Sequence, residues 1–344
     1  MKKVLSILLC LLMLLSFVFF AAASGVIYLF PSQTLPEDTL RVTAHRGLSA
    51  LAPENTLPAY RLAGAYGFWG AECDISQTAD GVWVLMHDMT VDRMTDGEGL
   101  VSDFTYAQLS ALTVDAGNNV EQFPGTKVPT LIEYLDVCKA YGLHPVIEIK
   151  EIVDVNNLPD LAAILSAREE KDRFVLISWG RELIAGIKTL LPDTPAYLIT
   201  SPATADDVDF CIQNGIDGLD AAYSISESMI RQAQDAGLKL MAWTVDSVTW
   251  AERMAAYGIL DLTSNCLVPG REPATEPTTK PTTEPTTEPT TEPTTEPTTQ
   301  PTTQPTTQPT TQPSGNDFSF GDFWQRIADW FRQIFTTIAG WFKR

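Results

Sequence analysis

The sequence has little positive charge and very little histidine. Its 344 residues include 23 lysines and arginines against 43 aspartates and glutamates, which gives a formal net charge of −20, and it has only three histidines. No basic run is present that could neutralise the phosphates of a nucleic acid, so binding to DNA or RNA is not expected. The remaining acidity bears on solubility and says little about the fold.

Cysteine is also scarce, with five in the chain. Cys10 lies within a long apolar run, and the other four (Cys73, Cys138, Cys211 and Cys266) follow no regular spacing. A domain of ordinary size does not need disulfides, so we expect buried free thiols. A pairing of Cys73 with Cys138 stays open, because Cys73 would face the layer between its strand and the next predicted helix.

Two of the three histidines belong to a group of short motifs between residues 44 and 150. The motifs are Ala-His-Arg-Gly (44–47), Pro-Glu-Asn-Thr (53–56), Glu-Cys-Asp (72–74), Thr-Ala-Asp-Gly (78–81), His-Asp (87–88) and Glu-Ile-Lys (148–150). Acid–base catalysis needs imidazoles, and a hard cation needs oxygen ligands. The clustering of both kinds of residue predicts a single active site.

The order and spacing of these six motifs resemble those of the glycerophosphodiester phosphodiesterase family, over roughly residues 40 to 270. The resemblance implies a metal-dependent enzyme that hydrolyses glycerophosphodiesters or lysolipid-like substrates to a glycerol phosphate and an alcohol. The alternative is a non-catalytic module, a barrel retained for binding and displayed on a surface. The presence of every motif residue disfavours that alternative.

Glu72, Asp74 and Glu148 are the predicted metal ligands. Glu72 and Asp74 are two residues apart, so both face the same side of a strand. Three converging carboxylates repel one another unless a cation lies among them, and ligands that are all oxygen favour Mg²⁺ or Ca²⁺ over zinc. For any one of these residues alone, a solvated loop carboxylate is the alternative.

Phosphodiester hydrolysis also needs an acid, a base and positive charge beside the phosphate. His45 and His87 are the predicted acid–base pair, and the sequence does not say which residue is the acid. Arg46 and Lys150 are expected to bind the phosphate, since the planar guanidinium of arginine suits its oxygens.

Further residues are candidates for supporting roles. By the resemblance, Glu54 and Asn55 brace the site, although the same segment also fits the start of a helix. Trp179 and Trp243 are expected either to wall the substrate pocket or to pack in the core. The chain departs from the family pattern at Asn265, where family members usually carry aspartate, and we expect altered metal affinity or leaving-group preference from it.

Short apolar strands alternate with amphipathic helical stretches between about residues 38 and 270. This pattern predicts an α/β fold, a (β/α)8 TIM barrel, whose active site lies at the carboxyl ends of the strands. His45, Glu72, Asp74 and Glu148 fall at or near those ends. The predicted strands are 41–45, 70–75, 145–149, 174–178, 196–199, 217–221, 238–244 and 259–263.

One further strand-like run, Val82–Met86, follows the turn motif at 78–81. If it folds back on 72–77 with residue pairs that sum to 159, His87 lies opposite Glu72. From 88 to about 128 the alternation stops. We therefore predict a small insertion after the second strand, over the barrel mouth, where it contributes to substrate selectivity.

Residues 1–30 predict an export signal. Lys2 and Lys3 precede an apolar run from Val4 to Ala23, long enough to span a bilayer. An uncleaved anchor and a cleaved signal peptide both fit this run. Because positive charge stays inside, the barrel is expected outside the cytoplasm, either membrane-anchored or secreted to the cell surface.

The end of the chain predicts a linker and a helix. Residues 271–316 include nine consecutive Pro-Thr-Thr-x units, which favour a disordered, extended linker. Residues 317–344 predict an amphipathic helix with an aromatic face and with Arg326, Asp329 and Arg332 on the other side. Such a helix suits a membrane interface, with docking onto a partner protein or self-association as the alternatives.

Overall fold

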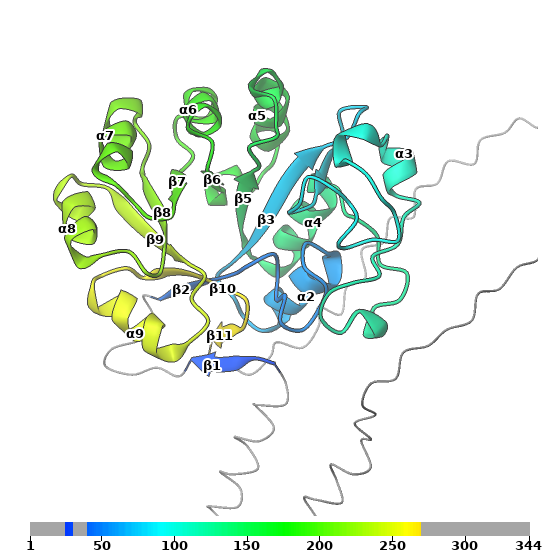
Figure 1. The fold of residues 1–344 in the computed structure, drawn as a ribbon, viewed down its shortest axis with the longest axis horizontal. Helices are drawn as coiled ribbons and strands as arrows, with labels where there is room; N and C mark the ends of the chain where they lie inside the picture. Colours follow the sequence, from blue (N-terminus) through cyan, green and yellow to red (C-terminus); the bar gives the residue numbers. More distant parts are fainter. Residues whose placement is uncertain (1–24, 30–39, 270–344) are drawn as a thin grey trace, which may run out of the picture. The chain divides into compact units, whose positions relative to one another are not determined.

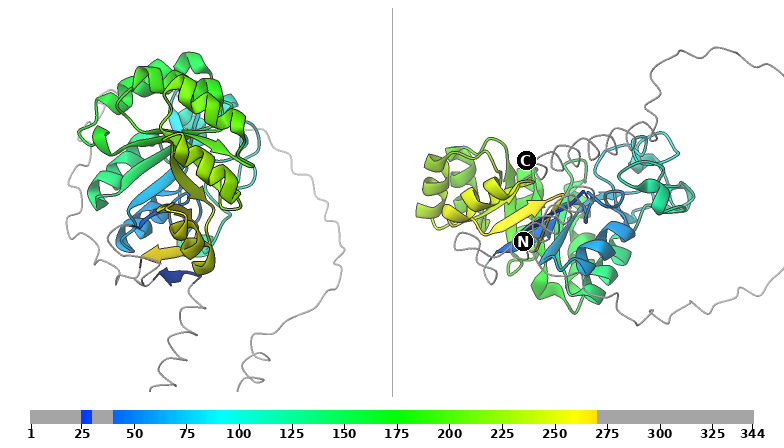
Figure 2. Two further views of the ribbon diagram at one scale, coloured as in Figure 1. Left: turned by 90° about the vertical axis from the view of Figure 1, so that its left-hand side faces the viewer. Right: turned by 90° about the horizontal axis from the view of Figure 1, so that it is seen from below.

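The computed structural model describes residues 25–29 and 40–269, which form a closed parallel barrel with helices around it (Figures 1 and 2). The prediction of a (β/α)8 barrel with these eight strands is confirmed, with strand ends shifted by a few residues. The strands in order around the barrel are β2 (Arg41–Ala44), β3 (Gly70–Gln77), β5 (His144–Ile149), β6 (Val175–Ser178), β7 (Ala196–Thr200), β8 (Gly218–Ala222), β9 (Lys239–Trp243) and β10 (Asp261–Ser264), which pairs with β2.

The helices occupy the outside of the barrel, as both views in Figure 2 show. Each barrel strand except the last is followed by a helix before the next barrel strand begins, which is the connection that parallel strands require. The helices are α2 (Leu57–Ala65), α4 (Leu131–Tyr141), α5 (Leu158–Ser166), α6 (Arg181–Leu190), α7 (Ala205–Asn214), α8 (Glu227–Asp235) and α9 (Val248–Ala256).

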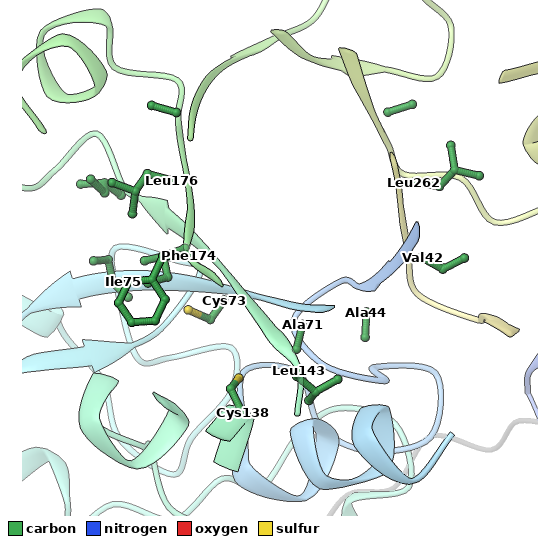
Figure 3. Packing of buried hydrophobic residues seen from close by; sticks show 14 of the residues in the cluster. Val42, Ala44, Ala71, Cys73, Ile75, Cys138, Leu143, Phe174, Leu176 and Leu262 are labelled. Atoms are coloured by element: carbon green, nitrogen blue, oxygen red, sulfur yellow. The ribbon is translucent and has the colours of Figure 1, made fainter. Parts of the chain in front are cut away.

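Alternation along β3 separates the core from the site. Ala71, Cys73 and Ile75 are fully buried in the layer between strands and helices, where Cys138 on α4 also lies (Figure 3). The residues between them, Glu72 and Asp74, therefore face the interior of the barrel. Cys73, Cys138, Cys211 and Cys266 all carry free thiols, and the first three are buried as predicted, whereas Cys266 is partly exposed.

The predicted hairpin exists, but its predicted register is wrong by one residue. β4 (Trp83–Leu85) pairs antiparallel with β3 through Ile75↔Leu85 and Gln77↔Trp83, so the pairs sum to 160 and His87 does not lie opposite Glu72. The cause is a three-residue loop: the Thr78 amide donates to the Val82 carbonyl, and Gly81 adopts a φ of 82°. Glycine tolerates this left-handed conformation, and it adds one residue to the expected turn.

The segment from 88 to 128 interrupts the barrel pattern and has a small core of its own. It contains the 3₁₀ turns η1 (Val101–Asp103) and η2 (Val120–Gln122) and the short helix α3 (Tyr106–Leu109). The buried residues of this core are Val84, Met86, Val91, Met94, Val101, Leu109, Val114 and Val128. Asn118 and Asn119 donate side-chain hydrogen bonds to the carbonyls of Ser49 and Leu51, which attach the insertion to the loop after β2.

A second, two-stranded sheet joins the two ends of the described region. β1 (Ile27–Leu29) runs parallel to β11 (Leu267–Pro269), with Ile27 paired to Leu267. Within residues 25–29 and 40–269, no helix has the length and apolar character needed to cross a membrane. The predicted export signal apart from residues 25–29, the linker and the C-terminal helix lie outside the described residues.

Candidate active site

Three carboxylates meet inside the barrel at the carboxyl ends of two neighbouring strands. Glu72 and Asp74 on β3 lie beside Glu148 on β5, since the two strands pair in register with Asp74 opposite Glu148. One oxygen from each residue can be chosen so that all lie within 4.8 Å of one another, and all three side chains are buried. The predicted ligand set is therefore brought together, and its spacing fits one hard cation.

The electrostatics of the three carboxylates also favour a cation. Burial raises the pKa of Glu72 well above its usual range, and the nearby charges of Asp74 and Glu148 add to this effect. Burial and Asp74 likewise raise the pKa of Glu148 to about 7. Oε1 of Glu72 is buried with no hydrogen-bond partner. A divalent ion would neutralise the repulsion among the carboxylates, and Oε1 of Glu72 could serve as one of its ligands.

Asn55 holds Asp74 in place. Its Nδ2 donates to Asp74 Oδ2 over 2.7 Å, and its Oδ1 accepts from the Asp74 amide over 3.1 Å and from the Tyr60 hydroxyl over 2.9 Å. The segment also starts a helix, as expected: Thr56 is the N-cap residue of α2, although its side chain makes no capping hydrogen bond. The segment thus starts the helix and braces the carboxylates at once.

Two cations stand beside the carboxylates. Lys150 follows β5 directly, and its Nζ lies 2.7 Å from Glu148 and 3.2 Å from Asp74. Arg46 has a φ of 56°, a left-handed conformation that is rare for a side-chain-bearing residue and that clusters at functional sites. Its backbone amide donates to Glu72, while its side-chain Nε is buried without a hydrogen-bond partner. Burial acts to raise the pKa of Asp74, but the positive charges of Lys150 and Arg46 outweigh this effect, so the pKa of Asp74 is lowered.

His45 follows β2 and is oriented by an amide. Its Nδ1 lies 2.7 Å from Oδ1 of Asn265. The amide orientation is fixed, because Asn265 Nδ2 donates to Asp246 over 2.7 Å, and a carboxylate only accepts. Nδ1 of His45 is therefore the protonated nitrogen, which leaves Nε2 free to accept a proton. Burial lowers the pKa of His45, and the charge of Arg46 lowers it further, while the hydrogen bond that His45 donates to Asn265 acts in the opposite direction.

His87 is oriented by a carboxylate. Its Nδ1 lies 2.7 Å from Oδ1 of Asp88, whose other oxygen accepts from Nε of Arg93 over 2.6 Å. The hydrogen bond from Arg93 holds the pKa of Asp88 at about 2, so Asp88 is an anion at neutral pH. The hairpin brings His87 close enough for its charge to lower the pKa of Asp74, despite the shifted register.

Trp179 and Trp243 meet edge to face at the carboxyl ends of β6 and β9, with ring centroids 5.4 Å apart. Both are partly buried against the apolar side chains that fill the barrel interior. Their packing against these side chains fits the expectation of a core position, and their place at the carboxyl ends of the strands fits the expectation of a pocket wall.

Sequence reasoning missed the partners of the two imidazoles. Asp88 and Arg93 orient His87, and Asp246 orients Asn265, for which we expected an effect on metal affinity or leaving-group preference and not a contact with His45. Only the adjacency of His87 and Asp88 was a visible signal. The contact between His45 and Asn265 spans 220 residues of sequence and depends on the closure of the barrel.

Fold and site together define a TIM-barrel enzyme with a carboxylate metal site flanked by two histidines. Residues 45–265 match the model of the glycerophosphoryl diester phosphodiesterase family. The chain belongs to this family and is an enzyme that hydrolyses glycerophosphodiesters.

Individual relatives agree with this assignment. The chain is 32% identical over 222 residues to a glycerophosphodiester phosphodiesterase of Caldanaerobacter subterraneus, a match that covers 63% of this chain and 90% of that protein. It is 45% identical over 116 residues to human glycerophosphodiester phosphodiesterase 1, covering 33% of this chain and 35% of the human protein. Among solved structures, it resembles an Oleispira antarctica phosphodiesterase in complex with the product sn-glycerol-3-phosphate, with a TM-score of 0.61, 28% identity and coverage of 67% of this chain and 93% of that one.

We expect a divalent cation to stabilise the protein more at higher pH. Glu148 has a raised pKa of about 7 against 4.5 in the unfolded chain, so the stability that it contributes is present below pH 4.5 and is lost as pH rises through about 7. The gain in Tm on adding Mg²⁺ or Ca²⁺ should therefore grow between about pH 5 and pH 8. Differential scanning fluorimetry with and without excess chelator measures it.

Glu148→Gln is the control for this experiment, since it removes one of the two carboxyls with a raised pKa and should weaken the dependence on pH. A gain in Tm that shrinks as pH rises would contradict the site.

Proposed function

We propose that this chain hydrolyses glycerophosphodiesters outside the cytoplasm by metal-assisted acid–base catalysis, with His45 as base and His87 as acid. The observation that carries the assignment is the difference between their Nδ1 partners. Asn265 is neutral, so His45 stays an uncharged ring whose Nε2 can accept a proton. Asp88 is an anion that lies against Nδ1 of His87, and this difference in partners assigns the role of proton donor to His87.

The reaction needs one proton removed and one supplied. His45 takes the proton of the attacking hydroxyl, from water or from the glycerol of the substrate, as a bond forms to phosphorus. Attack by the glycerol hydroxyl gives a cyclic phosphate, which water must then open to give glycerol phosphate. His87 gives a proton to the leaving oxygen as its bond to phosphorus breaks. Arg46 and Lys150 lie beside the carboxylates, where their positive charges would meet the nonbridging oxygens of the phosphate. Glu72, Asp74 and Glu148 would hold Mg²⁺ or Ca²⁺, which neutralises charge on the phosphate.

His45→Ala and His87→Ala should each lower kcat by ~10²–10⁴-fold, because each removes a proton transfer from the transition state. The assay is turnover of glycerophosphocholine by the full chain, with and without chelator. His144→Ala is the matched control: His144 opens β5 at the other end of the barrel, stacks on Trp69 at 4.2 Å, and should leave kcat near the native value.

Native rates in either His45→Ala or His87→Ala would refute the acid–base pair. Absence of turnover by the native chain with Mg²⁺ or Ca²⁺ would favour the alternative function, a non-catalytic binding module.

Asn265→Asp should shift the acid limb of the kcat/KM profile to higher pH. The new carboxylate would stabilise the protonated form of His45 and raise its pKa, so less base is available at a given acidic pH. Ser49→Ala is the control, because it removes a 3.1 Å hydrogen bond to the same Asn265 oxygen without adding charge. An acid limb that stays in place or moves to lower pH would show that His45 is not the base.

Membrane association is part of the proposal. Lys2 and Lys3 before the apolar run support an anchor or export signal that places the barrel outside the cytoplasm. The aromatic face within 317–344 supports a second contact with lipid, which would bring lysolipid-like substrates near the site. Docking of this helix onto a protein, or self-association, is the alternative.

A peptide of residues 314–344 should bind liposomes, more strongly as anionic lipid increases. Its aromatic face can enter the headgroup boundary while Arg326 and Arg332 meet the headgroups. The Trp330→Glu, Phe331→Glu double variant should lose this binding in a co-sedimentation assay. Equal sedimentation of both peptides, or none by the native one, would leave protein docking as the better explanation.

A further inference from the structure

The geometry points to Arg93 as a positioning residue that ties the proposed acid to the proposed phosphate-binding arginine. This inference rests on the proposed function for its kinetic consequence. Arg93 comes from the insertion, outside the barrel, and sequence analysis gave it no role.

One guanidinium bridges two carboxylates. Nη2 of Arg93 donates to Glu54 Oε1 over 2.6 Å, and Nε donates to Asp88 Oδ2 over 2.6 Å. Nη2 also lies 3.2 Å from Asp88 Oδ1, the oxygen that meets His87. The same Glu54 oxygen accepts from Nη1 of Arg46 over 2.9 Å. A continuous hydrogen-bonded path thus runs from His87 through Asp88, Arg93 and Glu54 to Arg46.

The bridge acts on both ends of the site. Asp88 must stay anionic and aligned to keep the Nδ1 proton of His87 in place. The guanidinium of Arg93 contacts both carboxylate oxygens of Asp88 and so fixes its orientation. Glu54 must stay against Arg46 to hold that guanidinium beside the buried carboxylates. Without Arg93, the two negative charges that share its Nη2 would repel each other and turn away from His87 and Arg46.

Arg93 is held by the core of the insertion. It stands in a turn in which the amides of Met94 and Thr95 both donate to the Val91 carbonyl. Met94 and Val91 are buried in the insertion core. The Arg93 side chain is 46% exposed, so its ion pairs add little stability by themselves, and what they fix is orientation. The insertion therefore forms part of the catalytic geometry in addition to bordering the site.

The test compares Arg93→Ala and Arg93→Lys in the full chain with Mg²⁺ or Ca²⁺. Arg93→Ala should lower kcat by about 10- to 100-fold, the usual effect of losing the residue that orients a reacting group's partner, and should raise KM through Arg46. Lysine keeps the charge but cannot span both carboxylates, so Arg93→Lys should retain most of the kcat loss, and both variants should keep a Tm near the native value. Arg168→Ala is the control, because Arg168 also bridges two carboxylates, Asp136 and Glu170, away from the site.

A second readout is independent of turnover. The Nδ1 proton signal of His87 in NMR spectra, assigned by its absence in His87→Ala, should move or broaden in Arg93→Ala while that of His45 stays unchanged. Native kcat and an unchanged His87 signal in Arg93→Ala would overturn the inference, as would equal kcat losses in Arg93→Ala and Arg168→Ala. If the native chain itself turned over no glycerophosphodiester, the proposed function would fail, and the NMR comparison would still decide the role of Arg93.

Discussion

Mutual repulsion among three buried carboxylates is the constraint on which the rest of the site depends. Glu72, Asp74 and Glu148 converge because β3 and β5 pair in register, and the barrel interior keeps water from screening them. Arg46, Lys150 and Asn55 each contact one or more of them. A divalent cation held by these three residues would relieve their repulsion, so it would contribute to the structure as well as to the chemistry.

The two histidines have the same ring but different surroundings, and this asymmetry is built from distant parts of the chain. His45 gains its amide partner where β10 closes the barrel, while His87 gains its carboxylate from the next residue and the insertion behind it. In the proposed mechanism the two histidines take opposite roles, and the partners of their Nδ1 atoms, a neutral amide and a carboxylate, distinguish them.

Local sequence patterns predicted the barrel well, because few parallel folds other than a barrel contain eight apolar strands that alternate regularly with helices. Pairing of β3 with β5 and the adjacency of motif residues followed from strand order and from the family resemblance. The hairpin register failed at a single glycine, because Gly81 can add one residue to the turn at no steric cost. Contacts between far-separated side chains, such as His45 with Asn265 or Arg93 with Glu54, depend on rotamers and on loop paths that no local pattern encodes.

The short sheet of β1 and β11 has a mechanical consequence. The described chain enters the domain at the amino end of β1 and leaves it at the carboxyl end of β11, and the two strands are parallel. A pull between the segment before residue 25 and the segment after residue 269 would load this pair in shear, with its hydrogen bonds strained together rather than one after another. Tension on the ends of the domain would thus act on the sheet of β1 and β11, while the strands that carry the carboxylates stay unloaded.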